Sequence, residues 1–239
     1  MKICMAQTRA VKGDIQENIK NHERMIATAI SHGARIIIFP ELSITGYEPA
    51  LAESLAMDSD DHRLDAFQEI SNANQITIGV GVPTKQRDGV CISLIVFQPG
   101  APRKIYSKKY LHPDEEPFFI SGENFPVIRI SAFNLALAIC YEISIQKHAK
   151  TAFENGAEIY IASVAKSVMG VNYAERRLSK IAKEYSAPVL MSNCVGKSDG
   201  FDSGGKSSVW DCQGILIGQL DAISEGILVY DSETQEVAY

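Results

Sequence analysis

Residues 35–47 read RIIIFPELSITGY. The apolar run at 35–39 predicts a strand buried on both faces, because a strand with one face in solvent would alternate apolar and polar side chains. Pro40 follows the run, so Glu41 is expected in the loop at the carboxyl end of the strand. Side chains at strand ends are held rigidly and can meet side chains from neighbouring strands, which makes Glu41 a candidate for chemistry.

Alternating strand and helix patterns extend in both directions from this stretch. Before it, residues 2–8 (KICMAQT) predict a strand, and Asp14 with Glu17 three residues later predicts the start of a helix that ends at Gly33. An α/β layered protein with one domain over residues 1–239 is therefore expected. After it, the patterns predict helices at 61–74, 145–155 and 173–185, strands at 76–82, 91–97, 103–107, 127–130, 135–140, 158–164, 189–195 and 226–230, a strand pair within 208–220, and a polar tail from Asp231.

The composition limits the classes of partner. The chain has 239 residues and a formal net charge of -6, which argues against nucleic acid or an acidic membrane surface as a partner, because either would call for a basic patch. Its apolar runs are too short to span a bilayer, so we expect a cytoplasmic protein that acts on a small molecule. Five scattered cysteines without a CxxC pair fit neither a disulfide framework nor a zinc site, and no metal is expected.

Two further reactive side chains lie where predicted strands end. Lys108 follows the strand at 103–107, and Cys140 closes the run LALAIC at 135–140. A cysteine is nucleophilic as the thiolate, so it needs a base or a cation nearby. A glutamate can take the thiol proton and return it to a leaving amine, while a lysine ammonium stabilises the oxyanion. The backbone N–H of Tyr141, directly after the cysteine, is a second candidate oxyanion donor.

Three local sequences strengthen this constellation. FPELSITGY at 39–47, YSKKYL at 106–111 and LALAICYE at 135–142 resemble, in this order, the three signatures of the nitrilase superfamily. The resemblance covers nearly the whole chain. It implies a four-layer α-β-β-α sandwich, a Glu-Lys-Cys triad, hydrolysis of carbon-nitrogen bonds without a metal or organic cofactor, and a homodimer or higher homo-oligomer.

The resemblance assigns roles residue by residue. It puts the base on Glu41, the lysine on Lys108 and the nucleophile on Cys140, although spacing alone does not separate Lys108 from Lys109. It also puts a second glutamate, which orients the lysine, on Glu115 in the long loop at 108–122. Two candidates for substrate binding complete the set: Tyr47, which closes the first signature, and Lys166, which follows the strand at 158–164 and can anchor a substrate carboxylate or lie solvated on the surface.

The sequence departs from the family pattern in two places. Ser107 stands where the family often has arginine, and Tyr185 stands where it often has asparagine. The triad does not depend on either position, but both leave the substrate class open.

Other interpretations of the reactive residues have weaker support. A papain-like cysteine and histidine pair would use His112 or His148, but neither has the matching local sequence. Residues 200–207, GFDSGGKS, match the phosphate-binding pattern GxxxxGKS. The β-branched residues that follow predict a hairpin where that mechanism needs a helix.

The predicted function is therefore hydrolysis of a small amide, of the amidase or N-carbamoyl hydrolase type. Nitrile hydrolysis and acyl transfer to an amine remain alternatives, because the same three residues serve all of these reactions. A non-catalytic binding protein is a second alternative. The presence of all three triad residues weakens it.

Overall fold

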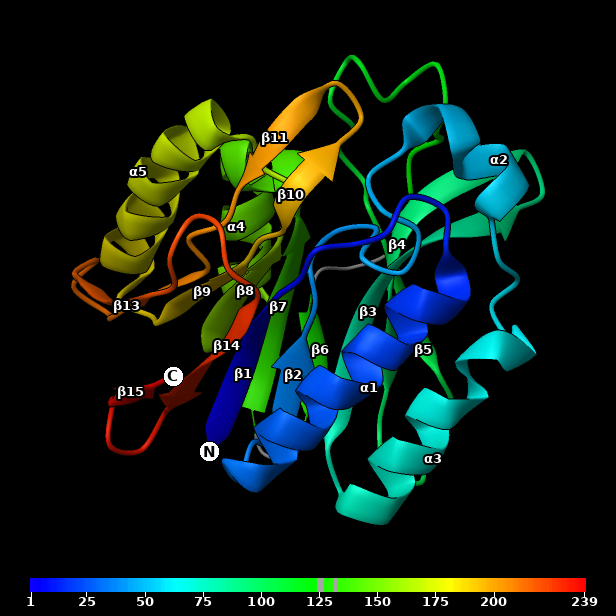
Figure 1. Cartoon of the computed structure of the whole chain (residues 1–239). Helices are drawn as coiled ribbons and strands as arrows, with labels where there is room; N and C mark the ends of the chain where they lie inside the picture. The colour runs from blue at the N-terminus through cyan, green and yellow to red at the C-terminus, as the bar shows by residue number, and fades with distance from the viewer. Residues whose placement is uncertain (124–126, 131–132) are drawn as a thin grey trace.

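Two β-sheets pack face to face, with helices on both outer faces (Figure 1). The structure is a computed structural model that describes residues 1–123, 127–130 and 133–239. It confirms the four-layer α-β-β-α sandwich. The first sheet has the order β15 (Val237–Ala238), β14 (Gly226–Asp231), β1 (Lys2–Gln7), β2 (Ile36–Ile38), β3 (Thr77–Gln86), β4 (Gly89–Phe97) and β5 (Lys104–Ser107).

The second sheet and the helices complete the sandwich. Helices α1 (Ile15–Ser31) and α3 (Asp65–Asn74) cover the first sheet, whereas α4 (Gln146–Glu154) and α5 (Val168–Tyr185) cover the second. A short helix, α2 (Ala52–Leu55), contacts β3 and β4, and a hairpin of β10 (Val195–Ser198) and β11 (Phe201–Gly204) forms a separate two-stranded sheet that contacts α5. The second sheet has the order β13 (Leu216–Gln219), β12 (Ser208–Trp210), β9 (Val189–Ser192), β8 (Ile159–Ser163), β7 (Phe133–Ile139) and β6 (Val127–Ile130).

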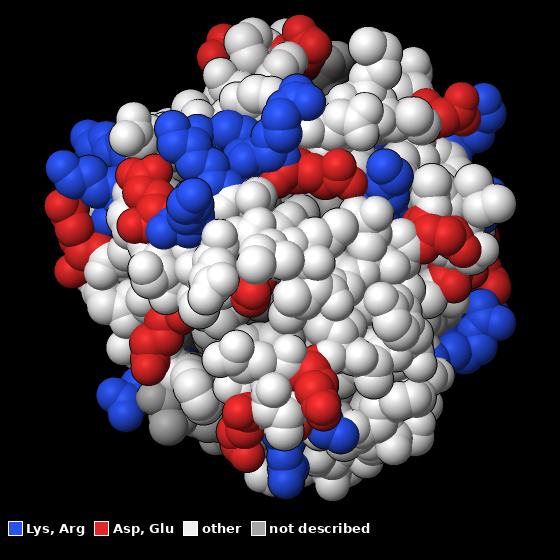
Figure 2. Space-filling view, turned by 90° about the vertical axis from the view of Figure 1, so that its left-hand side faces the viewer, with Lys and Arg blue, Asp and Glu red and all other residues white. Residues whose placement is uncertain are grey.

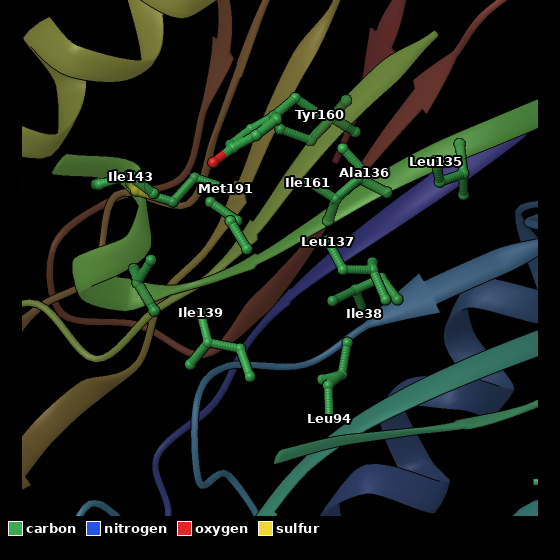
Figure 3. Packing of buried hydrophobic residues seen from close by; sticks show 14 of the residues in the cluster. Ile38, Leu94, Leu135, Ala136, Leu137, Ile139, Ile143, Tyr160, Ile161 and Met191 are labelled. Carbon is green, nitrogen blue, oxygen red and sulfur yellow. The ribbon is translucent and has the colours of Figure 1, made fainter. Parts of the chain in front are cut away.

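The largest apolar core lies between the sheets. Figure 3 shows Leu137 and Ile139 of β7 on the side of the core opposite Ile38 of β2 and Leu94 of β4. All four side chains are buried, and each contributes on the order of 1.5–3 kcal/mol relative to exposure. A second core fills the space between the first sheet and helices α1 and α3. Burial on both faces explains why β2 and the buried part of β7, residues 135–139, have unbroken apolar sequences.

Strand directions bring distant residues to one edge of the sandwich. Strands β2 and β3 are parallel, and two antiparallel steps from β3 through β4 make β5 run in the direction of β2. Glu41 and Lys108 therefore emerge at the same edge. In the second sheet, β7 and β8 are parallel, and Ser163 Oγ at the end of β8 donates a 2.8 Å hydrogen bond to the carbonyl of Phe39 after β2. That bond joins the carboxyl ends of the two sheets.

Helix α1 begins as the sequence predicts. The Asp14 side chain accepts a 3.1 Å hydrogen bond from the Glu17 N–H and caps the first turn. The buried face of the helix includes His22, whose ring stacks on Phe39 at 3.9 Å between centroids and bonds to Ser43 Oγ at 2.9 Å. Helix α1 therefore supports the segment on both sides of Glu41.

Several predicted boundaries are wrong. Helix α5 begins at Val168, earlier than predicted, because the Ser167 side chain caps it by accepting from the Gly170 N–H. The single strand predicted at 189–195 is two strands, since the Asn193 side chain binds backbone groups outside the ladder. The tail from Asp231 adds the edge strand β15, and Cys140 begins a 3-10 turn instead of ending β7.

Charges are interspersed on the face that carries α5. Figure 2 shows basic side chains gathered in the upper part of this face with acidic side chains beside them, and a largely uncharged middle. Within the described ranges 1–123, 127–130 and 133–239, no helix combines the length and the apolar character needed to cross a membrane.

Candidate active site

The loop after β2 places Glu41 in the interior. Its carboxylate is 3% exposed, and Leu42 next to it has a positive φ of 50°. The loop passes so close to β3 that a Cβ on Gly81 would collide with backbone atoms of Pro40 and Leu42. The Ile44 N–H donates to the Gly81 carbonyl at 3.0 Å and so fixes the far side of the loop. A glycine at position 81 is therefore a condition for the position of Glu41.

Lys108 lies directly after β5 and is completely buried. Its Nζ donates to Glu41 Oε1 at 2.7 Å and to Glu115 Oε1 at 2.7 Å. Its backbone N–H donates to the Ile92 carbonyl at 2.8 Å, which continues the pairing with β4. Lys109 is exposed. The geometry thus distinguishes two lysines that spacing alone leaves equivalent.

Glu115 holds the lysine from the long loop, as the sequence predicts. Besides Lys108, it accepts from the His112 N–H at 2.8 Å and from the Tyr47 hydroxyl at 3.0 Å. Burial and the nearby carboxylates of Glu41 and Glu115 raise the pKa of Tyr47, so its hydroxyl remains a donor. Tyr47, which the sequence assigns to substrate binding, is thereby tied to the charged cluster while it also lines the cavity described below.

Cys140 presents its sulfur where β7 gives way to the 3-10 turn Cys140–Ser144. Its φ of 45° is unusual for a residue with a side chain and costs on the order of 1–3 kcal/mol. The thiol lies 3.9 Å from the Ala165 carbonyl. It also lines a cavity of about 550 Å³ together with Tyr47, Glu115, Tyr141 and Lys166. The strained turn therefore directs the sulfur into a space that can hold a small molecule.

Burial and charge keep the resting site in defined protonation states. Burial, and then the Glu41 carboxylate, raise the pKa of Cys140 to about 11, although Lys166 and Lys108 act in the opposite direction. The thiol is thus protonated at neutral pH. Burial also raises the pKa of Glu41, against the effect of Lys108. Burial alone lowers the pKa of Lys108, but the charges around it, led by Glu41, outweigh burial and keep it above its usual range.

The two oxygens of the Glu41 carboxylate differ in their hydrogen bonding. Among the described residues, Oε2 has no hydrogen bond of normal geometry. The Cys140 thiol nevertheless lies close enough to lower the pKa of this carboxyl through a weak hydrogen bond. A buried carboxylate oxygen without a firm partner is costly, so it is prepared to accept a proton.

Glu142 is a site residue to which the sequence assigns no role. It is fully buried, and its Oε2 accepts from the Ile139 N–H at 2.8 Å and the Tyr106 hydroxyl at 2.6 Å. Its Oε1 accepts from the Lys109 N–H at 2.8 Å. Glu142 therefore joins the backbone beside Cys140 to the backbone beside Lys108. The acid in the quoted stretch LALAICYE is the signal that could have indicated it.

Lys166 shares the cavity with the nucleophile. Its backbone N–H donates to Asn193 Oδ1 at 2.8 Å, and its carbonyl accepts from the Gly204 N–H at 2.8 Å. The side chain lines the cavity and is partly buried. Lys166, a candidate for substrate binding because it follows a predicted strand, thus lies on the wall of the cavity.

The histidines do not form a pair with Cys140 in the papain manner. Both ring nitrogens of His148 are engaged, with Tyr106 and Tyr160 hydroxyls at 2.9 Å each. Burial lowers the pKa of His148 to about 4. His112 is exposed, and its ring packs edge-on against Tyr141 at 5.1 Å.

Residues 200–207 do not form a phosphate-binding loop. Phe201–Gly204 is strand β11, and Ser208 begins β12, which pairs antiparallel with β13. The hairpin predicted for this region is therefore confirmed.

The geometry agrees with the family comparison. The family model described as carbon-nitrogen hydrolase matches residues 2–238. The chain belongs to the carbon-nitrogen hydrolase family. The resemblance to the nitrilase superfamily is thereby confirmed. Of its expected positions, Glu41 and Lys108 are bonded to each other in the interior, and Cys140 lines the cavity.

Known relatives differ in what they do. A glutamine-dependent NAD(+) synthetase of Thermotoga maritima is 26% identical over 99% of this chain and 42% of its own length. This chain therefore spans about two-fifths of the length of that relative. A nitrilase of Pyrococcus abyssi is 26% identical over 87% of this chain and 80% of its own.

Among solved structures, an amidase from Nesterenkonia sp. AN1 superposes with a TM-score of 0.88 at 24% identity, covering 97% of this chain and 92% of that one. Variants of that amidase have been solved with butyramide and with an acetamide moiety added to the active-site cysteine. This likeness shows the shared fold.

Proposed function

We propose that the protein hydrolyses the carbon-nitrogen bond of a small amide through a thioester on Cys140. The observation that carries this proposal is the placement of one buried carboxylate, Glu41, between two groups. Its Oε1 accepts from the Lys108 ammonium at 2.7 Å, its Oε2 has no firm partner among the described residues, and the protonated thiol of Cys140 lies close enough to the carboxyl to lower its pKa. That thiol opens into a cavity of the size of a small metabolite.

The first half of the reaction forms the thioester. The amide carbonyl carbon lies against the sulfur, and Glu41 takes the thiol proton as the carbon-sulfur bond forms. The oxyanion is stabilised by the Lys108 ammonium and by the Tyr141 N–H, which lies in the first turn of a 3-10 segment where backbone donors lack partners within the turn. Glu41 then returns the proton to the nitrogen, the carbon-nitrogen bond breaks, and ammonia or an amine leaves.

The second half regenerates the enzyme. Water attacks the thioester carbon, Glu41 takes a proton from the water, and the carbon-sulfur bond breaks. The sulfur leaves as the thiolate and regains the proton from Glu41, so that one amide and one water give one carboxylic acid and one amine. The raised pKa of Glu41 suits this role, because the group must both accept and release a proton near neutral pH.

An amide is favoured over a nitrile on comparative grounds, because a proton carrier such as Glu41 serves both reactions. The amidase of the same fold is described with butyramide bound. The nitrilase relative keeps nitrile hydrolysis as the alternative, and acyl transfer would use the same thioester with an amine in place of water.

The test is intact-protein mass spectrometry after incubation with small amides, glutamine, N-carbamoyl amines and nitriles. We expect hydrolysis of at least one amide and a mass gain of its acyl group on Cys140. Cys140→Ala should lose both. Cys212→Ala, a matched control at a cysteine that is partly exposed, should keep both. Full turnover by Cys140→Ala would contradict the proposal, and turnover confined to nitriles would favour the alternative.

A further inference from the structure

The cavity beside Cys140 contains a second lysine that the hydrolytic steps above do not use. Lys166 lines this cavity together with Cys140, Tyr141 and Ala165. It lies close enough to the sulfur that its charge opposes the rise in the pKa of Cys140, ahead of Lys108. A positive charge is therefore present on the wall of the cavity beside the nucleophile.

The two lysines differ in their partners. Lys108 is bonded to two carboxylates at 2.7 Å each, which use its charge within the protein. In the part of the chain that the structure describes, the Lys166 ammonium makes no hydrogen bond or ion pair; its bonds are through the backbone only. A partly buried ammonium without a protein partner is available to an anionic group of a ligand.

The backbone of Lys166 is fixed, which limits the region that its side chain can reach. The Asn193 side chain bonds to both its N–H and its carbonyl, at 2.8 and 3.3 Å. The Gly204 N–H of the β10–β11 hairpin donates to the same carbonyl at 2.8 Å. Ser167, the next residue, caps the 18-residue helix α5, and the N-terminal end of a helix carries partial charge of the same sign.

The acidic residues around the cavity limit how many negative charges a ligand can carry. Asp114 and Asp199 also line it, but both are exposed at the rim. Asp114 lies 3.5 Å from His112 Nδ1, and the charge of Asp199 helps to raise the pKa of Lys12. Deeper in, two carboxylates, Glu41 and Glu115, are paired with one ammonium, Lys108. The positive charge of Lys166 therefore brings the net charge of the interior close to zero. One carboxylate beside Lys166 is thus favoured, and a second one near the rim is not.

We propose that Lys166 binds a carboxylate of the substrate, and that the preferred substrates are monoamides of small dicarboxylic acids. This inference rests on the proposed amide hydrolysis, because it names the acyl part that reaches Cys140. Lys166 has one other conceivable role, to stabilise the thiolate. The two roles separate cleanly, since thiolate stabilisation affects every amide equally and carboxylate binding affects only the acidic ones.

The experiment compares matched amides in which a terminal carboxylate replaces a methyl group: succinamate with butyramide, and glutaramate with pentanamide. We expect the wild-type protein to prefer the acidic member of at least one pair in kcat/KM. Lys166→Met should lower kcat/KM for that acid about 10- to 100-fold and change the neutral partner less than about 3-fold. Equal losses on both members, or no loss on the acid, would overturn the inference.

Lys197→Met is the control for long-range charge. Lys197 is an exposed lysine on the same hairpin region, and it is paired with Asp202 at 3.0 Å. Its removal changes the net charge by the same amount without touching the cavity. We expect it to leave the preference for the acid unchanged. A loss as large as that of Lys166→Met would show a general charge effect and would overturn the inference.

A binding measurement separates this inference from the proposed function. Calorimetric titration of Cys140→Ala with the same four amides needs no turnover. If the acid binds more tightly and Lys166→Met in that background removes the difference, carboxylate binding stands even where the wild type hydrolyses none of the four. If Cys140→Ala binds acid and neutral amide alike, the inference fails even where hydrolysis occurs.

Discussion

Two buried glutamates near the nucleophile, Glu41 and Glu142, differ in how completely their oxygens are hydrogen-bonded. Glu142 accepts from the backbone of Ile139 and Lys109 and from the Tyr106 hydroxyl, so both of its oxygens are used. Glu41 has one firm bond, to Lys108, and a second oxygen without one among the described residues. Both carboxyls have a pKa raised by burial.

The difference shows how a buried acid is made structural or reactive. A carboxylate with all its acceptor sites filled by rigid donors gains nothing from a proton and holds its neighbours in place. A carboxylate left partly unsatisfied beside a thiol gains a partner when the proton arrives. The same residue type at a similar depth therefore serves positioning at 142 and proton transfer at 41.

The largest expected effect is that of Glu41→Gln. This change keeps the shape of the side chain and removes its ability to accept a proton. We expect amide turnover to fall about 10²- to 10⁴-fold, with a change in the free energy of unfolding below about 1 kcal/mol, because no rigid donor loses its only partner. Steady-state kinetics and urea unfolding measure the two quantities. A large loss of stability would place Glu41 in the same class as Glu142.

Glu142→Gln should show the reverse balance. The amide of glutamine has one acceptor oxygen, so one of the bonded backbone N–H groups at Ile139 or Lys109 is left unpaired. We expect a loss of about 1–3 kcal/mol in the free energy of unfolding and a smaller fall in turnover than for Glu41→Gln. If turnover fell as far as in Glu41→Gln while stability was unchanged, Glu142 would be the proton carrier and the comparison would be wrong.

The network behind Glu142 predicts a pH dependence of stability. Tyr106 donates to Glu142, which leaves its hydroxyl oxygen to accept from His148 Nε2; when His148 is neutral, its Nδ1 then accepts from the Tyr160 hydroxyl. The pKa of His148 is lowered by burial to about 4, against about 6.5 in the unfolded chain. The unfolded state therefore binds the extra proton first. Stability from this group is complete above pH 6.5 and is lost as the pH falls toward 4.

The steepest loss from His148 is about 1.4 kcal/mol per pH unit. Other groups titrate in the same range, including His22, whose pKa is lowered by burial to about 3. Urea unfolding from pH 7 to 4 in wild type and in His148→Gln isolates the contribution of His148 as the difference in slope. Equal slopes in the two proteins would contradict a neutral His148 in the folded protein.

The smallest expected effect is that of Tyr106→Phe, about 1 kcal/mol in the free energy of unfolding. The hydroxyl bonds to both Glu142 and His148. In a double-mutant cycle with Glu142→Gln, the two losses should add to more than the loss in the double variant, because they remove one shared bond. Strict additivity would show that the Tyr106 hydroxyl does not support Glu142.

The sequence predicted the parts of the site that follow from buried strands. Unbroken apolar runs at 36–39 and 135–140 predict two buried strands, and Glu41 and Cys140 lie where these runs end. Lys108 and Lys109 are adjacent, and only the pairing of β5 with β4 determines which side chain turns inward. The predicted homo-oligomer and the absence of a nucleic-acid partner stay predictions, which light scattering and binding assays can test.

Other features depend on contacts that no local pattern encodes. The bonds of Glu142 reach residues 33 and 36 positions away in sequence. The early start of α5 depends on the Ser167 cap, ahead of Gly170 and β-branched residues that weaken a helix prediction. The β10–β11 hairpin exists beside the sheet because Asn193 bonds across to Lys166 and Gly205.

The most direct test of the central claim uses two substrates that deliver the same acyl group to Cys140. Butyramide needs a proton on its leaving nitrogen, whereas 4-nitrophenyl butyrate releases a stable phenolate and does not. Removing the Glu41 charge also removes one of the causes that raise the pKa of Cys140. We predict that Glu41→Gln keeps formation of the butyryl thioester from the ester, within about 10-fold of wild type, and loses it from the amide by at least about 100-fold. Equal losses from the two substrates would contradict the account, because Glu41 would then not be the group that delivers the proton to the leaving nitrogen.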